Sequence, residues 1–168
     1  MSETTKILVR NARDQDIPAV VEIDAEAFPS HGTTESPETF QHRLRAFPDG
    51  FIILVADNEI AAYGCTEKRF AEHEPGLDED ALGTHQPDGR ILRITGMAVK
   101  KKYRGRGYGL LMLDKLIEIA HRERCQKIVA ETTHAQGLFL KRGFKPVQQR
   151  MEGRISLDVM SLDMSGAA

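Results

Sequence analysis

The pattern of hydrophobic and polar residues divides the chain into short stretches that predict interleaved strands and helices. Stretches that alternate or are continuously apolar predict strands, and these are residues 7–11, 51–56, 60–66, 91–99, 127–132, 145–150 and 155–162. Apolar residues at helical spacing predict helices, and these are residues 16–28, 37–47, 109–122 and 134–141. Elements in this order predict an α/β (α+β) fold.

The fourth predicted strand contains one irregularity. Leu92 and Ile94 share one face, whereas Met97 and Val99 share a face of opposite parity. Because the side chains of a strand alternate with a period of two, the phase must slip between these pairs, as it does at a β-bulge. The sequence therefore predicts a bulge near Thr95-Gly96.

A basic, glycine-rich segment at residues 104–109 separates this strand from the next helix. Glycines leave the backbone bare, so successive N–H groups can point at one anion, and a helix N-terminus adds its partial positive charge. Three lysines at residues 100–102 add fixed positive charge. The segment predicts a phosphate cradle, in preference to the alternative of a tight turn beside a solvated basic surface.

Two other phosphate-binding patterns match this segment less well. A P-loop needs a Lys-Ser or Lys-Thr pair after its glycines, and none follows here. A dinucleotide fingerprint needs the spacing G-x-G-x-x-G, whereas Leu110 stands at the place of the third glycine. Glu131 lies at about the right distance for a ribose-binding acid. A nucleotide-binding domain of Rossmann type is therefore kept as a minor alternative.

Composition narrows the class of protein. The 168 residues are 40% hydrophobic and 29% charged, which is ordinary for a globular domain, and we expect residues 1–168 to form one domain. The net charge of -2 does not favour a nucleic-acid partner. No apolar run is long enough to span a membrane, and the polar N-terminus lacks the core of a signal peptide. Cys65 and Cys125 lie far apart, which favours free thiols in a reducing cytoplasm over a disulfide or a metal site.

Two motifs resemble those of the GNAT superfamily of N-acetyltransferases. The first is an apolar strand end followed by Arg/Gln-x-x-Gly-x-Gly/Ala, and it is matched by Met97, Ala98, Val99, Arg104, Gly107 and Gly109. The second, a later motif, is similar at Ala135, Phe139, Lys141, Gly143 and Phe144. The resemblance spans about residues 91–147. It implies a central mixed β-sheet flanked by helices, with a bulged strand before the loop that binds coenzyme A.

The resemblance also implies an acetyl-CoA-dependent N-acetyltransferase without a metal. Backbone N–H groups near Met97 to Val99 would polarise the thioester carbonyl and stabilise the oxyanion of the tetrahedral intermediate. The residues expected to bind acetyl-CoA are Met97, Ala98, Val99, Arg104, Gly105, Arg106, Gly107, Tyr108, Gly109, Leu110 and Phe139.

The expected catalytic groups depart from the family pattern. Many members carry a glutamate on the bulged strand, and Thr95 stands at that place, where it could position a water but not act as a base. Glu131 is the nearest carboxylate that could take a proton from the amine, with His31 and His134 as alternatives. Many members also use a tyrosine to protonate the departing thiolate, and Phe139 stands at that place.

The acceptor is weakly encoded. The region from Phe28 to Phe51 is similar to the arylalkylamine N-acetyltransferase-like branch, which implies a small amine, such as an aromatic one, that contacts Phe28 and His31. A polypeptide N-terminus is the other acceptor class, and a non-catalytic acyl-CoA-binding or sensing domain is the alternative function. The acidic stretch 70–89 predicts a solvated loop, with a lid that attracts a cationic amine as the sharper alternative. Homodimers are common in the family, but the sequence does not decide the oligomeric state.

Overall fold

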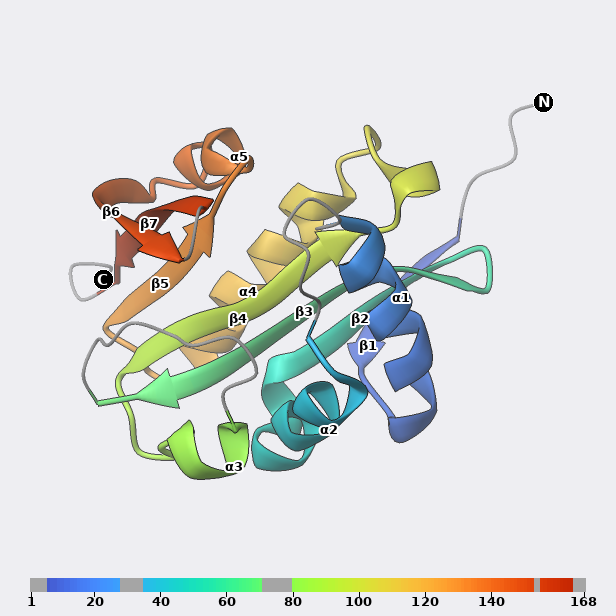
Figure 1. Ribbon diagram of the computed structural model, residues 1–168, viewed down its shortest axis with the longest axis horizontal. Coiled ribbons are helices and arrows are strands. Elements are labelled where there is room, and N and C mark those ends of the chain that lie inside the picture. Colours follow the sequence, from blue (N-terminus) through green and yellow to red (C-terminus); the bar gives the residue numbers. More distant parts are fainter. Residues whose placement is uncertain (1–5, 28–34, 71–79, 153–154, 165–168) are drawn as a thin grey trace.

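In the computed structural model, residues 6–27, 35–70, 80–152 and 155–164 are described. Across these ranges seven strands form one sheet in the order β1-β2-β3-β4-β5-β7-β6 (Figure 1). The strands are β1 (Ile7–Asn11), β2 (Phe51–Ala56), β3 (Glu59–Arg69), β4 (Ile91–Val99), β5 (Lys127–Thr132), β6 (Lys145–Glu152) and β7 (Ile155–Asp163). Neighbouring strands are antiparallel except β4 and β5, which are parallel. The expected mixed sheet is therefore confirmed, and a Rossmann-type parallel sheet is excluded.

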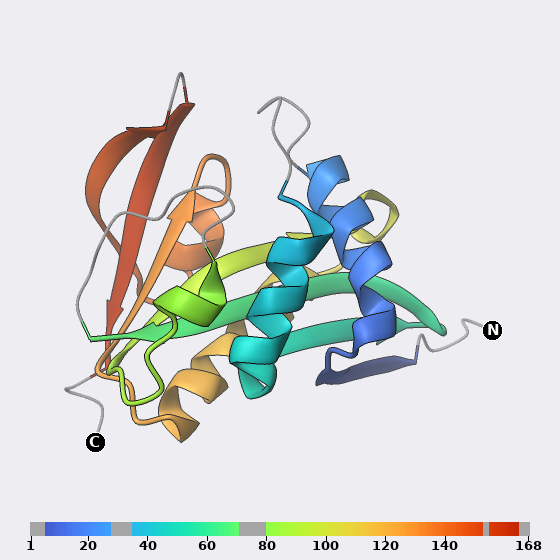
Figure 2. The ribbon, with the colours of Figure 1, turned by 60° about the horizontal axis from the view of Figure 1, so that its bottom comes forward.

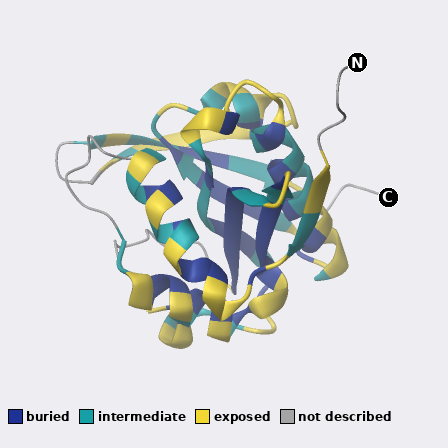
Figure 3. Ribbon diagram, turned by 90° about the vertical axis from the view of Figure 1, so that its right-hand side faces the viewer, coloured by how far each residue is buried: buried dark blue, intermediate teal, exposed yellow. Residues whose placement is uncertain are grey.

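Helices cover both faces of the sheet. They are α1 (Ile17–Ala27), α2 (Pro37–Ala46), α3 (Ala81–Thr84), α4 (Tyr108–Arg122) and α5 (Gln136–Leu140), with short 3-10 turns at Asp14–Asp16, Pro48–Gly50 and Lys101–Tyr103. Figure 2 shows α1 and α2 on one face and α4 on the other. The central strands are buried between helices whose outer sides are exposed (Figure 3).

Each face of the sheet has its own hydrophobic core. Under α1 and α2, Val20 and Phe40 pack against Tyr63, and the rings of Phe40 and Tyr63 meet edge to face at 5.7 Å. Under α4, Met112 and Leu116 pack against Leu92 and its neighbours. Gly64 of β3 faces Leu116 and Met112 without a side chain of its own, which lets α4 approach the sheet closely.

Local signals in the sequence account for most of the element boundaries. The Ser36 Oγ accepts a hydrogen bond from the Thr39 N–H at 3.2 Å and caps α2, with Pro37 in the first turn. Asp57 and Asn58 both have positive φ angles, 50° and 67°, as the tight turn between β2 and β3 requires. Gly143, with φ of 86°, ends the turn after α5.

Two predictions about the helices need correction. The buried face of α4 consists of Tyr108, Met112, Leu113, Leu116, Ile119 and Ala120. The helical spacing of Leu110, Leu113, Ile117 and Ala120 in the sequence predicts a different stripe. Leu110 and Ile117 are only half-buried at the edge of the observed one, so the true stripe is rotated around the helix. The short helix expected at residues 134–141 is confined to α5, because the Thr132 hydroxyl binds the Ala135 N–H at 2.7 Å and holds the preceding turn outside the helix.

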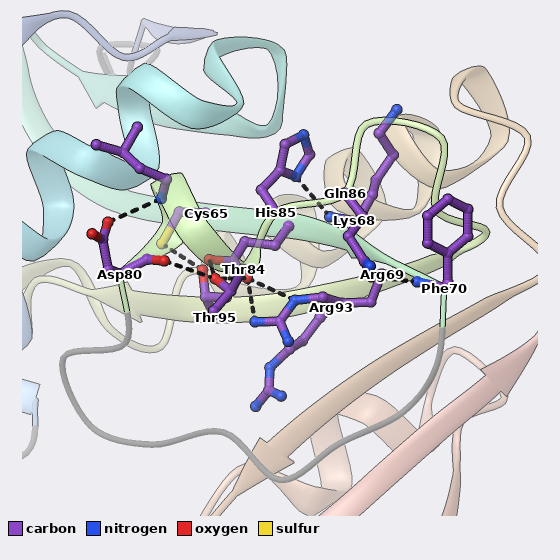
Figure 4. A network of polar contacts seen from close by, with 12 residues as sticks. Cys65, Lys68, Arg69, Phe70, Asp80, Thr84, His85, Gln86, Arg93 and Thr95 are labelled. Carbon is purple, nitrogen blue, oxygen red and sulfur yellow. Dashed lines mark hydrogen bonds and ion pairs between the residues drawn. The ribbon is translucent and has the colours of Figure 1, made fainter.

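The stretch 70–89, expected to be an irregular loop, is partly ordered where it is described. Strand β3 continues to Arg69, and the charged residues at its end are buried by pairing. Arg69 forms an ion pair with Glu67, and the Thr84 hydroxyl donates to Glu67 at 3.1 Å (Figure 4). Asp80 caps α3 by accepting from the Leu82 N–H at 3.0 Å. Buried ion pairs explain the missed strand end, because charged residues erase the apolar alternation on which the strand prediction depends. Residues 71–79 lie outside the described ranges, so the proposed acidic lid is not described there.

Candidate functional site

Strands β4 and β5 separate in the middle of the sheet. They pair only at Ile91, Leu92 and Arg93, after which β5 continues against β7 alone. On its other side, β4 pairs with β3 through a register shift that matches Cys65 to Gly96 and Thr66 to Ile94 and skips Thr95. This is the bulge that the phase slip predicts, and beyond it the two strands part.

A cavity of about 540 Å³ lies where the strands part. Its lining is supplied by β4, the end of β5 and the turn after it, α1, α5, β7, the segment before α2 and the loop before α4. The lining residues are Asp24, Ala27, Glu35, Ile94, Thr95, Gly96, Met97, Ala98, Val99, Arg104, Glu131, Thr132, Thr133, His134, Ala135, Phe139 and Leu157. Met97 and Val99 belong to the core under α4, whereas Ala27 packs with the core under α1 and α2. The cavity therefore joins the two faces of the sheet.

The glycine-rich segment has the geometry of an anion cradle. Gly105 and Gly107 have φ angles of 80° and 82°, and a Cβ added to either glycine would meet nothing within 4 Å. Gly107 is the N-cap of α4, so the free N–H groups and the partial positive charge of that helix face the open space. Arg104 lines the adjacent cavity, held by a hydrogen bond from its Nε to the Val99 carbonyl oxygen at 3.2 Å. A pyrophosphate fits these groups.

The basic residues before the cradle contact the carboxylate of Glu59 and the ring of Tyr103. Glu59 accepts hydrogen bonds from Lys100 at 2.9 Å and from the Tyr103 hydroxyl at 2.5 Å. Lys102 and Arg106 both lie over the Tyr103 ring, each 5.2 Å from its centroid. These contacts fix the loop, and hydrogen bonds from Lys102, Tyr103 and Lys100 lower the pKa of Glu59 to about 2.

The remaining residues expected to bind acetyl-CoA divide into two groups. Met97, Ala98, Val99, Arg104 and Phe139 line the cavity. Gly105, Arg106, Gly107, Tyr108, Gly109 and Leu110 form the loop and the first turn of α4 beside it. Within this second group Tyr108 is buried, with its ring 6.2 Å from that of Tyr103. Phe28 and His31, expected at the acceptor side, lie outside the described residues.

The two expected catalytic residues, Glu131 and Thr95, both line the cavity, and each forms side-chain hydrogen bonds. Glu131 accepts from Arg150 Nε at 2.7 Å and from Arg93 at 3.5 Å, so arginines from β6 and β4 bracket its carboxylate. The Thr95 hydroxyl donates to Cys65 Sγ at 3.3 Å (Figure 4). Burial raises the pKa of the Cys65 thiol to about 11, so this sulfur is a neutral acceptor.

Two carboxylates in the cavity were missed by the sequence prediction. Asp24 of α1 is only 7% exposed, and the Tyr63 hydroxyl donates to its Oδ1 at 2.7 Å. Glu35, just before α2, forms an ion pair with the buried Arg43. A signal for Asp24 was present in the sequence, because it occupies the same helical face as Val20 and Ala27, where a solvated acid is not expected.

In the part of the chain that the structure describes, no group of His, Cys, Asp or Glu side chains is arranged to hold a metal ion. None of the helices in those ranges combines enough length with enough hydrophobicity to cross a lipid bilayer. Cys65 and Cys125 are both buried free thiols, as the sequence predicts.

A splayed pair of strands with an anion cradle at the next helix defines an acyl-CoA-dependent transferase, and comparison with known proteins gives the family. The sequence model of the acetyltransferase (GNAT) family matches residues 17–144, and the chain belongs to that family. It is thus an acyltransferase whose acetyl donor is acetyl-CoA, which confirms the activity and the cosubstrate expected from the sequence.

Individual relatives agree with this assignment. A candidate ribosomal protein bS18-alanine N-acetyltransferase of Bacillus subtilis (strain 168) is 29% identical over 147 residues, which are 84% of this chain and 83% of that protein. The ribosomal-protein-S18-alanine N-acetyltransferase of Escherichia coli has the same fold, with a TM-score of 0.70, 19% identity and 97% of each chain covered. A candidate acetyltransferase from Salmonella typhimurium, solved with acetyl-CoA, has a TM-score of 0.71, 18% identity and 96% of each chain covered.

Proposed function

We propose that the protein transfers the acetyl group of acetyl-CoA to a primary amine that enters the cavity as an ammonium cation. One observation carries the proposal: a single cavity runs from Arg104 and the bulge of β4 to the carboxylates of Asp24, Glu35 and Glu131. The cationic end suits the phosphates of the donor, and the acidic end suits a positively charged acceptor. Holding both substrates in one cavity supplies much of the rate enhancement by proximity.

We assign the donor to the cradle and to the parted edge of β4. Arg104 and the backbone of Gly105 and Gly107 would hold the pyrophosphate. N–H groups of β4 between Met97 and Val99 alternate between β3 and the gap, and those that face the gap would bind the thioester carbonyl and the oxyanion that forms there.

Proton removal and thiolate departure would proceed without the glutamate and the tyrosine that many family members use, because Thr95 and Phe139 stand at those places. Thr95 is proposed to position a water beside the acceptor nitrogen, while Glu131 adds negative charge to the acceptor end. Phe139, buried against Phe144 at a centroid distance of 5.2 Å, supplies no hydroxyl for the thiolate. This is compatible with turnover, because a thiol with a pKa of about 8.5 leaves as a thiolate near neutral pH.

Two acceptor classes remain as candidates. A small-molecule amine is the class that the sequence predicts. The N-terminal amine of a polypeptide is favoured by one specific observation, the similarity over 84% of this chain to a candidate ribosomal protein bS18-alanine N-acetyltransferase. Both acceptors are ammonium ions at neutral pH, so the same acidic end of the cavity would receive either.

The test begins with calorimetric titration of the protein with acetyl-CoA, CoA and NAD. Thiol release is then measured with a panel of small amines and with a peptide that begins with alanine, using the N-acetylated peptide as the control. We expect acetyl-CoA to bind and thiol release to depend on a free amine. Binding of acetyl-CoA without release on any acceptor would favour the non-catalytic sensing domain, and no binding of CoA would overturn the assigned cradle.

A further inference from the structure

We infer that Asp24, positioned by the Tyr63 hydroxyl, is the carboxylate that takes the proton from the acceptor ammonium. This inference rests on the proposed function, and it assigns a role to a residue that the family pattern does not mark. Asp24 lines the cavity from α1, on the face of the sheet opposite α4.

Tyr63 connects Asp24 to the bulge of β4. Its hydroxyl donates to Asp24 Oδ1 at 2.7 Å, and the same oxygen lies 3.1 Å from the position that a Cβ on Gly96 would occupy. Tyr63 and Gly96 are therefore in contact at the point where the ladder skips Thr95. The carboxylate of Asp24 is thus held next to the part of β4 where the thioester carbonyl is expected, which is where an attacking amine must arrive.

Tyr63 is suited to donate a hydrogen bond to the Asp24 carboxylate without losing its own proton. Burial, together with the nearby charge of Asp24, raises the pKa of Tyr63 well above its ordinary value. The hydroxyl therefore keeps its proton and always donates. A fixed donor orients the Asp24 side chain and favours its ionised form, which is the form that can accept a proton.

The other two carboxylates of the cavity are committed to arginines. Glu131 is bracketed by Arg93 and Arg150, and Glu35 is paired with Arg43. Guanidinium groups this close offset part of the negative charge that Glu131 and Glu35 present to the substrate ammonium. Asp24 accepts from the Tyr63 hydroxyl beside the bulge of β4, and this position next to the expected thioester makes it the better site for the nitrogen that has to lose a proton.

Several charged or titratable groups face Asp24 and enter its pH dependence. They come from β3, from α2 with the residue before it, and from the opposite wall of the cavity. These groups are Tyr63, Cys65, Glu35, Arg43, Arg104, Glu131 and His134.

The step balances with one base. The ammonium gives a proton to the Asp24 carboxylate, and the nitrogen lone pair then forms the C–N bond at the thioester carbon. As the carbonyl re-forms, the C–S bond breaks and coenzyme A leaves as a thiolate. The nitrogen loses its second proton, the thiolate takes up one proton, and Asp24 returns its own to water. The overall products are the acetylated amine, the free thiol and one proton.

The deciding experiment measures kcat/KM against pH for Asp24→Asn and Glu131→Gln in the full chain, with acetyl-CoA binding and thermal unfolding recorded for each. Asparagine keeps an oxygen that can accept from Tyr63, so we expect Asp24→Asn to fold and to bind acetyl-CoA normally. We expect its kcat/KM to fall by about 100-fold or more near neutral pH. The loss should shrink as the pH approaches that at which the free amine is abundant, about 8 for an α-amine.

A second variant separates positioning from general damage. Tyr63→Phe removes the donor that favours ionised Asp24, so the acidic limb of the pH–rate profile should move to higher pH, whereas a structural defect would lower the rate equally at every pH. Glu22→Gln, which removes an exposed carboxylate from the same helix, is the matched control and should leave the profile unchanged.

The outcomes separate this inference from the proposed function. A folded Asp24→Asn protein that loses less than about tenfold in kcat/KM overturns the inference while leaving the transferase intact. A large loss in Glu131→Gln with none in Asp24→Asn overturns it too and makes Glu131 the base. Absence of thiol release from the unmodified protein with every acceptor overturns both the inference and the proposed function.

Discussion

The ammonium group of Lys102 lies 2.6 Å from Oε2 of Glu59, joining the loop before α4 to the first residue of β3. Glu59 also binds Lys100 and Tyr103, so one half-buried carboxylate contacts three side chains of the basic loop. The cradle is therefore shaped by a contact with a strand far from it in sequence.

The Glu59 cluster should make stability depend on pH in the acid range. The pKa of Glu59 is about 2 in the folded protein and about 4.3 in an unfolded chain. Because the folded pKa is the lower one, the stabilisation is present above about pH 4.3 and is lost as the pH falls toward 2. We expect the difference in unfolding midpoint between the protein and Glu59→Gln to be largest at pH 6 and to shrink by pH 3. Chemical denaturation at both pH values measures it, and a constant difference would contradict the assignment.

Substitution of Gly107 tests the cradle directly. We expect Gly107→Val to weaken acetyl-CoA binding by about tenfold or more, equivalent to about 1.4 kcal/mol, because its side chain fills the open space at the N-terminus of α4. Valine at a φ of 82° should also cost about 1–2 kcal/mol of folding free energy. Gly83→Val is the control, since it adds the same volume in open space without a positive φ. Calorimetry should show unchanged affinity in the control, and unchanged affinity in folded Gly107→Val would refute the cradle.

Glu131 should matter for stability as well as for the acceptor. Its two arginine partners, Arg93 and Arg150, have side chains only 8% and 9% exposed. Glu131→Gln removes a carboxylate that both buried cations contact, so we expect the free energy of unfolding to fall by about 3 kcal/mol. Urea unfolding measures this loss. The exposed Glu118→Gln on α4 serves as the reference, and an equal, small effect of both substitutions would show that the arginines are satisfied without the Glu131 charge.

Cys65 should not carry the acetyl group. It lies beside the bulge, but with a pKa of about 11 only about one thiol in a thousand is ionised at pH 8. We expect Cys65→Ala to keep its transfer rate and the native thiol to resist iodoacetamide until the protein unfolds. Mass spectrometry after a brief reaction with acetyl-CoA is the decisive measurement. An acetyl group on Cys65 that is passed on to the amine would replace direct transfer with a two-step reaction.

Much of the fold could be predicted because its signals are local. The bounds of β1, β2, β4 and β5 agree with the apolar runs of the sequence, and the bulge at Thr95 follows from a phase slip within one strand. The end of β3 could not be predicted in this way, because Glu67 and Arg69 are polar residues buried by pairing with each other and with Thr84.

The candidate site also has a part that local sequence signals predict and a part that they do not. The cradle is encoded in consecutive residues, so its glycines and Arg104 could be placed from the sequence. The acceptor end is assembled from distant parts of the chain. Asp24 meets Tyr63 only because α1 packs across β3, and Arg150 reaches Glu131 only because β7 lies between β5 and β6. The spacing of residues along the sequence does not predict these two contacts directly.

Strands β4 and β5 pair at only three residues, a short seam in the sheet, and this bears on the stability of the folded enzyme when its substrate is scarce. Four strands lie on one side of the seam and three on the other. The gap beyond the seam is where we propose that the acetyl donor binds. A ligand that binds only the folded chain adds about 2.7 kcal/mol of stability at one hundred times its Kd. The donor is therefore a structural part as well as a reagent. When acetyl-CoA falls well below its Kd, we expect the folded protein to lose this stabilisation together with turnover.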